Sequence, residues 1–186
     1  MEKHEIKAEI EKELSEFSGS FVVNILIDRH IYHQVPILLL EYWLKDPKVH
    51  GLYISLNTPY EDIYGKLKES NLDVNSVYCI DGASKETGKF SNSERCFCLD
   101  DPSSLTELSL LIKSLCNENK IRFIVLNSLS TLLLYNNTQD VEKFAHSLLN
   151  HARKYDISVA ILSPKEQSKE DVTAEITQFC DKEIEL

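Results

Sequence analysis

Short runs of β-branched and aliphatic residues alternate along the chain with longer amphipathic stretches. Continuous apolar runs of this length are typical of strands that are covered on both faces. The predicted strands are 21–27, 52–56, 77–80, 95–99, 121–126, 157–162 and 182–186. Each of the first five is followed by polar or turn-forming residues, so the runs end cleanly.

The amphipathic stretches carry apolar residues at helical spacing and predict helices between the strands. Their predicted ranges are 2–17, 36–45, 59–67, 102–115, 138–152 and 169–179. Three starts have capping signals: Thr58-Pro59-Tyr60-Glu61 resembles a capping box, Asp101-Pro102 is expected to cap the fourth helix, and Thr138 the fifth. The polar stretch 83–94 is expected to be an exposed loop.

Strands that alternate with amphipathic helices predict an α/β fold. We expect a doubly wound, mainly parallel sheet with helices on both faces. The domain is expected to span residues 19–186, preceded by an amphipathic helix in residues 1–18. The apolar stripe of that helix must be buried, either on its own sheet or against a second copy of the chain, and the second option predicts a homodimer.

Composition narrows the class of protein. The net charge is −10 with no run of Lys or Arg, which argues against nucleic acid as a partner. No apolar run is long enough to span a membrane, and the polar, acidic start does not resemble a signal peptide. We therefore expect a cytoplasmic protein.

Five cysteines form an odd set without C-x-x-C spacing, so neither disulfides nor a metal site are expected. Cys96 and Cys98 would share one face of a strand. The sequence displays no partners for them, which favours their interpretation as small buried residues.

In a parallel sheet, ligands bind where the strands end. After the first strand, a phosphate-binding loop would need glycines, a lysine and a serine or threonine. Residues 28–35 contain none of these. Asn127 stands where a carboxylate would anchor magnesium, and Asn57-Thr58 stand where a general base is expected. We therefore expect no catalytic residues and no cofactor.

Three segments carry a resemblance to a known family. GLYISLNTPY at 51–60 looks like the second strand and helix start of KaiC-like members of the RecA superfamily. FIVLNSLSTLL at 123–133 is similar to their Walker B strand and its continuation. Together with FCDKEIEL at 179–186, the chain resembles an archaeal-type branch of inactivated RecA-superfamily ATPases implicated in signal transduction.

The resemblance implies a RecA-like core that lacks the P-loop and a pseudo-ATPase that acts in signalling or regulation by binding another protein. A vestigial nucleotide cleft would lie at the strand ends. Its candidate residues are Asp28, Arg29, Asn57, Thr58, Asn127, Ser128 and Lys165.

Two alternatives remain open. In a receiver-like phosphoacceptor domain, Asp81 would be the carboxylate nucleophile, Ser128 would contact the phosphoryl group and Lys165 would balance its charge. In a small-molecule sensor, Arg29 and Lys165 would attract an anion into the vacated cleft.

Overall fold

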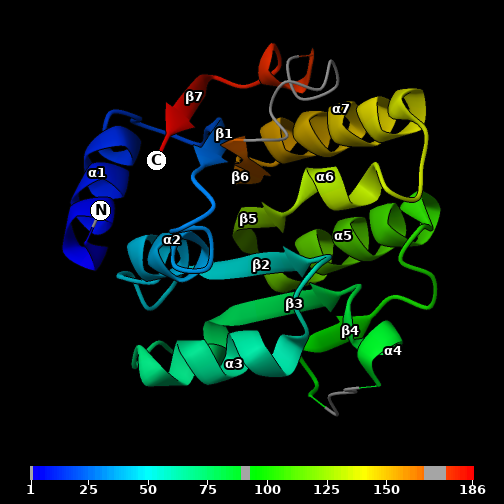
Figure 1. Cartoon of the computed structure of the whole chain (residues 1–186), viewed down its shortest axis with the longest axis horizontal. Coiled ribbons are helices and arrows are strands. Elements are labelled where there is room, and N and C mark those ends of the chain that lie inside the picture. Colours follow the sequence, from blue (N-terminus) through cyan, green and yellow to red (C-terminus); the bar gives the residue numbers. More distant parts are fainter. Residues whose placement is uncertain (1, 89–92, 166–174) are drawn as a thin grey trace.

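The computed structural model describes residues 2–88, 93–165 and 175–186, which form one seven-stranded sheet (Figure 1). All strand pairings are parallel, in the order β4-β3-β2-β5-β6-β1-β7. The strands are β1 (Val22–Ile27), β2 (His50–Ser55), β3 (Val77–Asp81), β4 (Cys96–Cys98), β5 (Ile121–Asn127), β6 (Ser158–Pro164) and β7 (Lys182–Glu185). The predicted α/β class and parallel sheet are confirmed.

Helices cover both faces of the sheet, as doubly wound topology requires. The apolar side chains of α1, α2 and α3 pack on one face, and those of α5, α6 and α7 pack on the other (Figure 1). The helices are α1 (Lys3–Ser15), α2 (Val35–Trp43), α3 (Tyr60–Glu69), the short 3-10 helix η1 (Val74–Ser76), α4 (Ser84–Thr87), α5 (Leu105–Asn119), α6 (Leu129–Leu132) and α7 (Thr138–Lys154).

Helix α1 belongs to this packing. Its stripe residues Ile6, Ile10 and Leu14 are at most 2% exposed and share a core with α2. Lys182 on β7 forms ion pairs with Glu13 and Glu16 of the helix, and the C-terminus lies near the helix in Figure 1. The stripe is therefore buried against its own domain, which is the first of the two arrangements considered from the sequence.

The predicted helix starts need three corrections. The capping box is absent, because α3 begins at Tyr60 and no side chain of its N-cap residue accepts a hydrogen bond. The N-cap of α5 is Ser104, whose Oγ accepts from the backbone of Glu107, and not Asp101. The N-cap of α7 is Asn137, one residue before Thr138. At α5 and α7 a side-chain oxygen close by in the sequence accepts from the first turn, whereas at α3 the carboxylate of Asp81 accepts from the N–H of Tyr60.

Two predicted segments lie partly outside the described residues. The expected loop 83–94 contains the short helix α4, and its residues 89–92 are not described. Of the helix predicted at 169–179, only residues 175–179 are described. Among the described helices, none combines the length and the apolar character needed to cross a bilayer.

Helix α1 provides a first test. Ile10→Ala should lower the free energy of unfolding by about 2–5 kcal/mol, because it leaves a cavity in a closed core. Lys12→Ala, on the exposed side of the same helix, should cost less than about 1 kcal/mol. Urea unfolding measures both, and equal effects would contradict the burial of the stripe.

A close approach between Gly51 and Phe123 provides a second test. An added Cβ at Gly51 would lie 1.9 Å from the Phe123 ring, and this ring is stacked on Trp43 with 4.7 Å between centroids. Gly51→Ala should therefore cost about 3 kcal/mol through overpacking. Gly65→Ala, in α3 with open space around it, should instead stabilise by about 0.5–1 kcal/mol. Thermal unfolding of both variants checks these opposite signs.

Candidate functional site

The carboxyl ends of the parallel strands meet at one edge of the sheet, where the sequence placed its candidate residues. Asn127 ends β5, the strand between β2 and β6. Asn57 and Thr58 follow β2, and Asp28 follows β1. Topology therefore brings the end of the expected Walker B strand beside the end of β2, as expected for a RecA-like core.

Asn127 is the centre of a hydrogen-bonded cluster. It is 3% exposed, and its Nδ2 donates to the hydroxyl of Tyr53 at 2.7 Å. Its Oδ1 accepts from the hydroxyl of Tyr32 at 2.7 Å and from Asn57 Nδ2 at 3.4 Å. The buried amide thus has protein partners on both its donor and its acceptor side, which removes the cost of burying it.

Tyr32 comes from the loop that would hold phosphate in an active enzyme. The backbone N–H groups of His30, Ile31 and Gln34 donate to acceptors within the loop. All of residues 28–34 are described, and none has positive φ, so the alternating backbone of an anion-binding nest is absent. Burial raises the pKa of the Tyr32 hydroxyl to about 12, so it remains a neutral donor.

The cleft beside this cluster is small. Its volume is about 180 Å³, below the roughly 300–1,000 Å³ of typical ligand pockets. Its lining residues are Tyr32, His33, Pro36, Ile37, Tyr53, Asn57, Thr58, Ile63, Lys66 and Asn127. The polar lining comes from neutral side chains together with His33 and Lys66.

Only Asn57, Thr58 and Asn127 of the seven candidate residues line the cleft. Ser128 lies beside it, and its Oγ hydrogen bonds with Ser130 and Thr131. The remaining candidates are elsewhere: Asp28 and Arg29 are exposed, and Lys165 forms an ion pair with Glu185. These three residues do not line this cleft in the structure, where the loop after β1 places Tyr32 against Asn127.

Tyr32 and Tyr53 were missed by the sequence analysis. Tyr53 lies on β2, is fully buried, and carries a hydroxyl whose pKa is raised by that burial. A tyrosine in the middle of an apolar strand run is a visible signal, since its hydroxyl must find a partner when buried. Its partner, however, lies on β5, which sequence alone does not place beside it.

Asp81, at the end of β3, is occupied by structural hydrogen bonds. It is 1% exposed and accepts from the backbone N–H groups of Tyr60, Ala83 and Ser84 and from the Ser84 hydroxyl. The bond from Tyr60 caps the start of α3, as the predicted capping box was expected to do. The other bonds hold the loop after β3.

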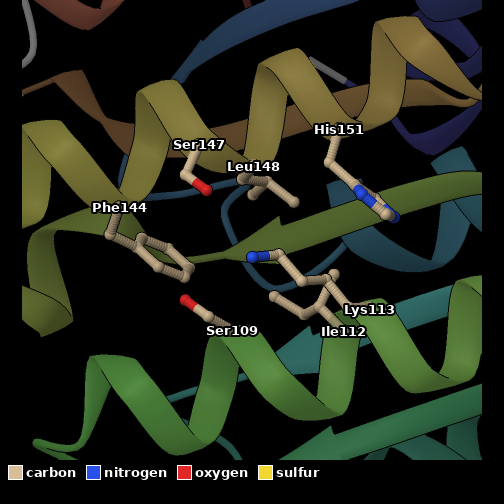
Figure 2. Close-up of a pocket in the computed structure, with 7 residues that line it drawn as sticks. All are labelled: Ser109, Ile112, Lys113, Phe144, Ser147, Leu148 and His151. Carbon is tan, nitrogen blue, oxygen red and sulfur yellow. The ribbon is translucent and has the colours of Figure 1, made fainter.

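A second recess lies between α5 and α7, away from the strand ends (Figure 2). Figure 2 shows Ser109, Lys113 and Ser147 directed into it. Its volume of about 10 Å³ is that of a single water molecule. The Nε2 atom of His151, which borders it, is buried and has no hydrogen-bond partner among the described residues. Burial lowers the pKa of His151, and Lys113 and Lys154 lower it further.

The comparisons with known proteins bear on the fold. No protein-family profile matches the chain, and no curated protein is significantly similar to it. Among solved structures, a KaiC-like protein from the hyperthermophilic archaeon Pyrococcus horikoshii matches with a TM-score of 0.64 at 10% sequence identity. The match covers 91% of this chain and 72% of the other. The chain therefore has the RecA-like α/β fold seen in a KaiC-like protein.

The burial of Tyr32 predicts a pH dependence of stability. Burial raises the pKa of Tyr32 to about 12, above its usual value of 10.0, so its contribution to stability is complete below pH 10 and is lost as the pH rises toward 12, where the unfolded chain ionises first. A shift of this size corresponds to about 3 kcal/mol. Tyr32→Phe should cost about 1 kcal/mol at neutral pH and should lose less stability than the unmodified chain between pH 10 and 12.

Tyr135→Phe is the matched control, since this tyrosine is 47% exposed. Its stability should follow that of the unmodified chain across the same range. Urea unfolding at a series of pH values makes the comparison, and identical curves for Tyr32→Phe and Tyr135→Phe would argue against the buried hydroxyl.

Proposed function

We propose that this chain is a non-catalytic RecA/KaiC-like domain, a pseudo-ATPase that acts in signalling or regulation by binding another protein. The observation that carries this proposal is the hydrogen bond from Tyr32 to Asn127. It joins the loop after β1 to the end of β5, the two positions between which a RecA-type enzyme would hold phosphates and magnesium.

The chemistry of the strand ends supports the absence of turnover. Nucleotide hydrolysis needs a phosphate cradle, a carboxylate for magnesium and a group that activates water. Within the loop 28–34, the N–H groups of His30, Ile31 and Gln34 donate to acceptors of the loop itself. Asn127 brings no charge to a metal. Asp81 ends a strand near the cleft, but its oxygens already accept hydrogen bonds from three residues.

Exposed apolar side chains support the binding of a protein partner. Leu110 on α5 is 63% exposed, and Leu134 and Tyr135 after α6 are 76% and 47% exposed. Leu110 also lines a groove of about 600 Å³ between α5 and α7. An exposed apolar side chain beside a groove is a feature of interaction sites. A homodimer is one form of this proposal.

The two alternatives gain no support from the geometry. Strand β2 separates Asp81 on β3 from Ser128 after β5, so the phosphoacceptor triad is not assembled, and Asp81 is buried. The anion sensor relied on Arg29 and Lys165, and neither lines the cleft.

The test is a steady-state ATPase assay with magnesium, together with thermal unfolding in the presence of a panel of nucleotides and metabolites. We expect no turnover and no shift of the unfolding midpoint with ATP. Asn127→Ala serves as the paired variant, because it removes the centre of the cluster. Light scattering over a range of protein concentrations measures whether a second copy is a partner.

Robust turnover that disappears in Asn127→Ala would refute the proposal. A midpoint shift caused by one metabolite, without turnover, would instead favour the sensor. Contaminating ATPase would be recognised because it would persist in Asn127→Ala.

A further inference from the structure

Three cysteines and one aspartate form a two-by-two array on neighbouring strands at one edge of the sheet. In the parallel pairing of β3 with β4, Cys79 lies opposite Cys96 and Asp81 lies opposite Cys98. Residues two apart on a strand point to the same face. Cys79 and Cys96 pack on the α1–α3 side of the sheet, whereas the intervening Ile80 packs on the other side.

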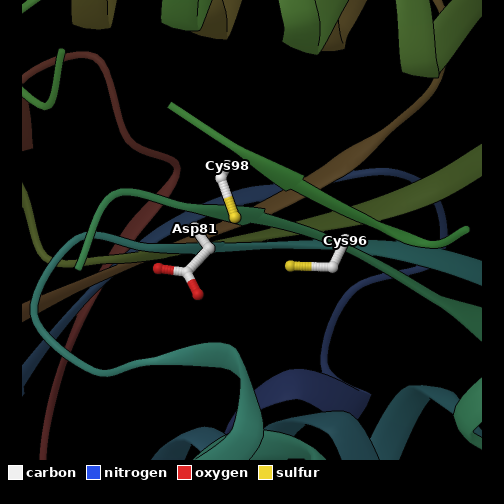
Figure 3. Close-up of side chains that lie close together, drawn as sticks. All are labelled: Asp81, Cys96 and Cys98. Atoms are coloured by element: carbon white, nitrogen blue, oxygen red, sulfur yellow. The ribbon is translucent and has the colours of Figure 1, made fainter. Parts of the chain in front are cut away.

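The functional atoms of this array are close together. One ligand atom each from Asp81, Cys96 and Cys98 lies within 4.8 Å of the other two, and Figure 3 shows the three side chains reaching into the same space. Cys79 is the register partner of Cys96, and the neighbouring Cys96 thiol, together with burial, raises the pKa of Cys79. Zinc bound tetrahedrally by thiolates, with Zn–S bonds of about 2.3 Å, needs sulfur atoms about 3.8 Å apart. Shifts of about 1 Å would therefore bring the sulfur atoms of Cys96 and Cys98 to ligating distance.

Access and burial differ among the cysteines. Cys96 and Cys98 are half-buried, whereas Cys79 is buried beneath them. An ion could therefore reach the first two thiols from the surface and meet the third from inside. Cys116 and Cys180 differ from these cysteines. They lie on other elements, and among the described residues neither belongs to a cluster of three or more potential metal ligands.

Asp81 has a different role in the array. Its carboxylate already accepts hydrogen bonds from Tyr60, Ala83 and Ser84, so ligating a metal would cost the caps that it provides. It contributes a fixed negative charge next to the sulfur atoms. The sulfur atoms themselves are soft ligands, which prefer Zn²⁺, Cd²⁺ and Cu⁺ over Mg²⁺ or Ca²⁺.

We propose that Cys96 and Cys98, backed by Cys79, form a binding site for a thiophilic metal ion of the Zn²⁺ class, positioned beside the Asp81 carboxylate. Each thiol that ligates releases its proton to solvent, and the thiolates then neutralise the charge of the ion. The site lies on the β3–β4 edge and does not depend on the proposed function. It departs from the sequence-based expectation of no metal, because the partners of Cys96 and Cys98 become visible only in the strand register.

The experiment is a titration of the reduced, metal-free protein with Cd²⁺, followed by thiolate-to-metal charge-transfer absorption in the ultraviolet. We expect saturation at a single equivalent and reversal by an excess of EDTA. Cys96→Ser and Cys98→Ser should each lose the saturable absorption. Cys180→Ser should retain it, and it is a matched control because Cys180 is also a half-buried cysteine. Circular dichroism checks that each metal-free variant is folded.

A second measurement uses the unmodified chain, in case a serine variant does not fold. Zn²⁺ should protect Cys96 and Cys98 from alkylation, mapped by mass spectrometry, and should leave Cys180 equally reactive with and without metal. Absence of saturable absorption, or its survival in the Cys96→Ser/Cys98→Ser double variant, would overturn the proposal. Equal protection of Cys180 would do the same, since binding would then be nonspecific.

Discussion

The buried side-chain amide of Asn127 is the polar group around which the strand-end edge of the sheet is organised. A buried amide without partners is costly, so the structure must supply both a donor and an acceptor for it. Tyr53 supplies the acceptor from β2, and Tyr32 supplies the donor from the loop after β1. The hydrogen bond to this amide therefore fixes the position of the loop, and Tyr32 and His33 of the loop form part of the lining of the cleft.

Asp81, at the end of β3 on the same edge of the sheet, is also a buried polar residue that the structure provides with hydrogen-bond partners. Its carboxylate links β3 to the first turn of α3 and to the loop that leads into α4. Together, Asn127 and Asp81 use side-chain hydrogen bonds within the protein at positions where an enzyme of this fold would direct polar groups toward a ligand. As a result, the side chains of Asn127 and Asp81 already have hydrogen-bond partners within the protein.

Much of the fold was predictable from the sequence, because apolar runs and helical periodicity report burial directly. All seven strands lie where the apolar runs place them, and 21–27 differs from β1 by a single residue. The helix starts were less predictable. The N–H of Tyr60 is taken by Asp81, which is 21 residues away, and no local signal reveals such a partner. At α5 and α7 the cap is local, but it is supplied by Ser104 and Asn137 and not by the predicted residues.

The candidate site, like the fold, was predictable only in part from the sequence. The residue types at 28–35, Asn57 and Asn127 could be identified, because they are visible in the sequence. The contacts made at these positions could not, because the Tyr32 and Tyr53 contacts join segments 95 and 74 residues from Asn127. The pairing of Cys79 with Cys96 likewise depends on register between strands. Contacts between side chains on different strands can be predicted only when the strand order and register are known.

The position of β1 has a consequence for how this chain folds. β1 lies between β6 and β7, so both of its neighbouring strands come from residues 158–185, and Val22 pairs with Val159. Pairings between segments so far apart in the sequence close slowly. Until they form, β1 is an apolar strand with two open edges, and open strand edges invite association with other chains.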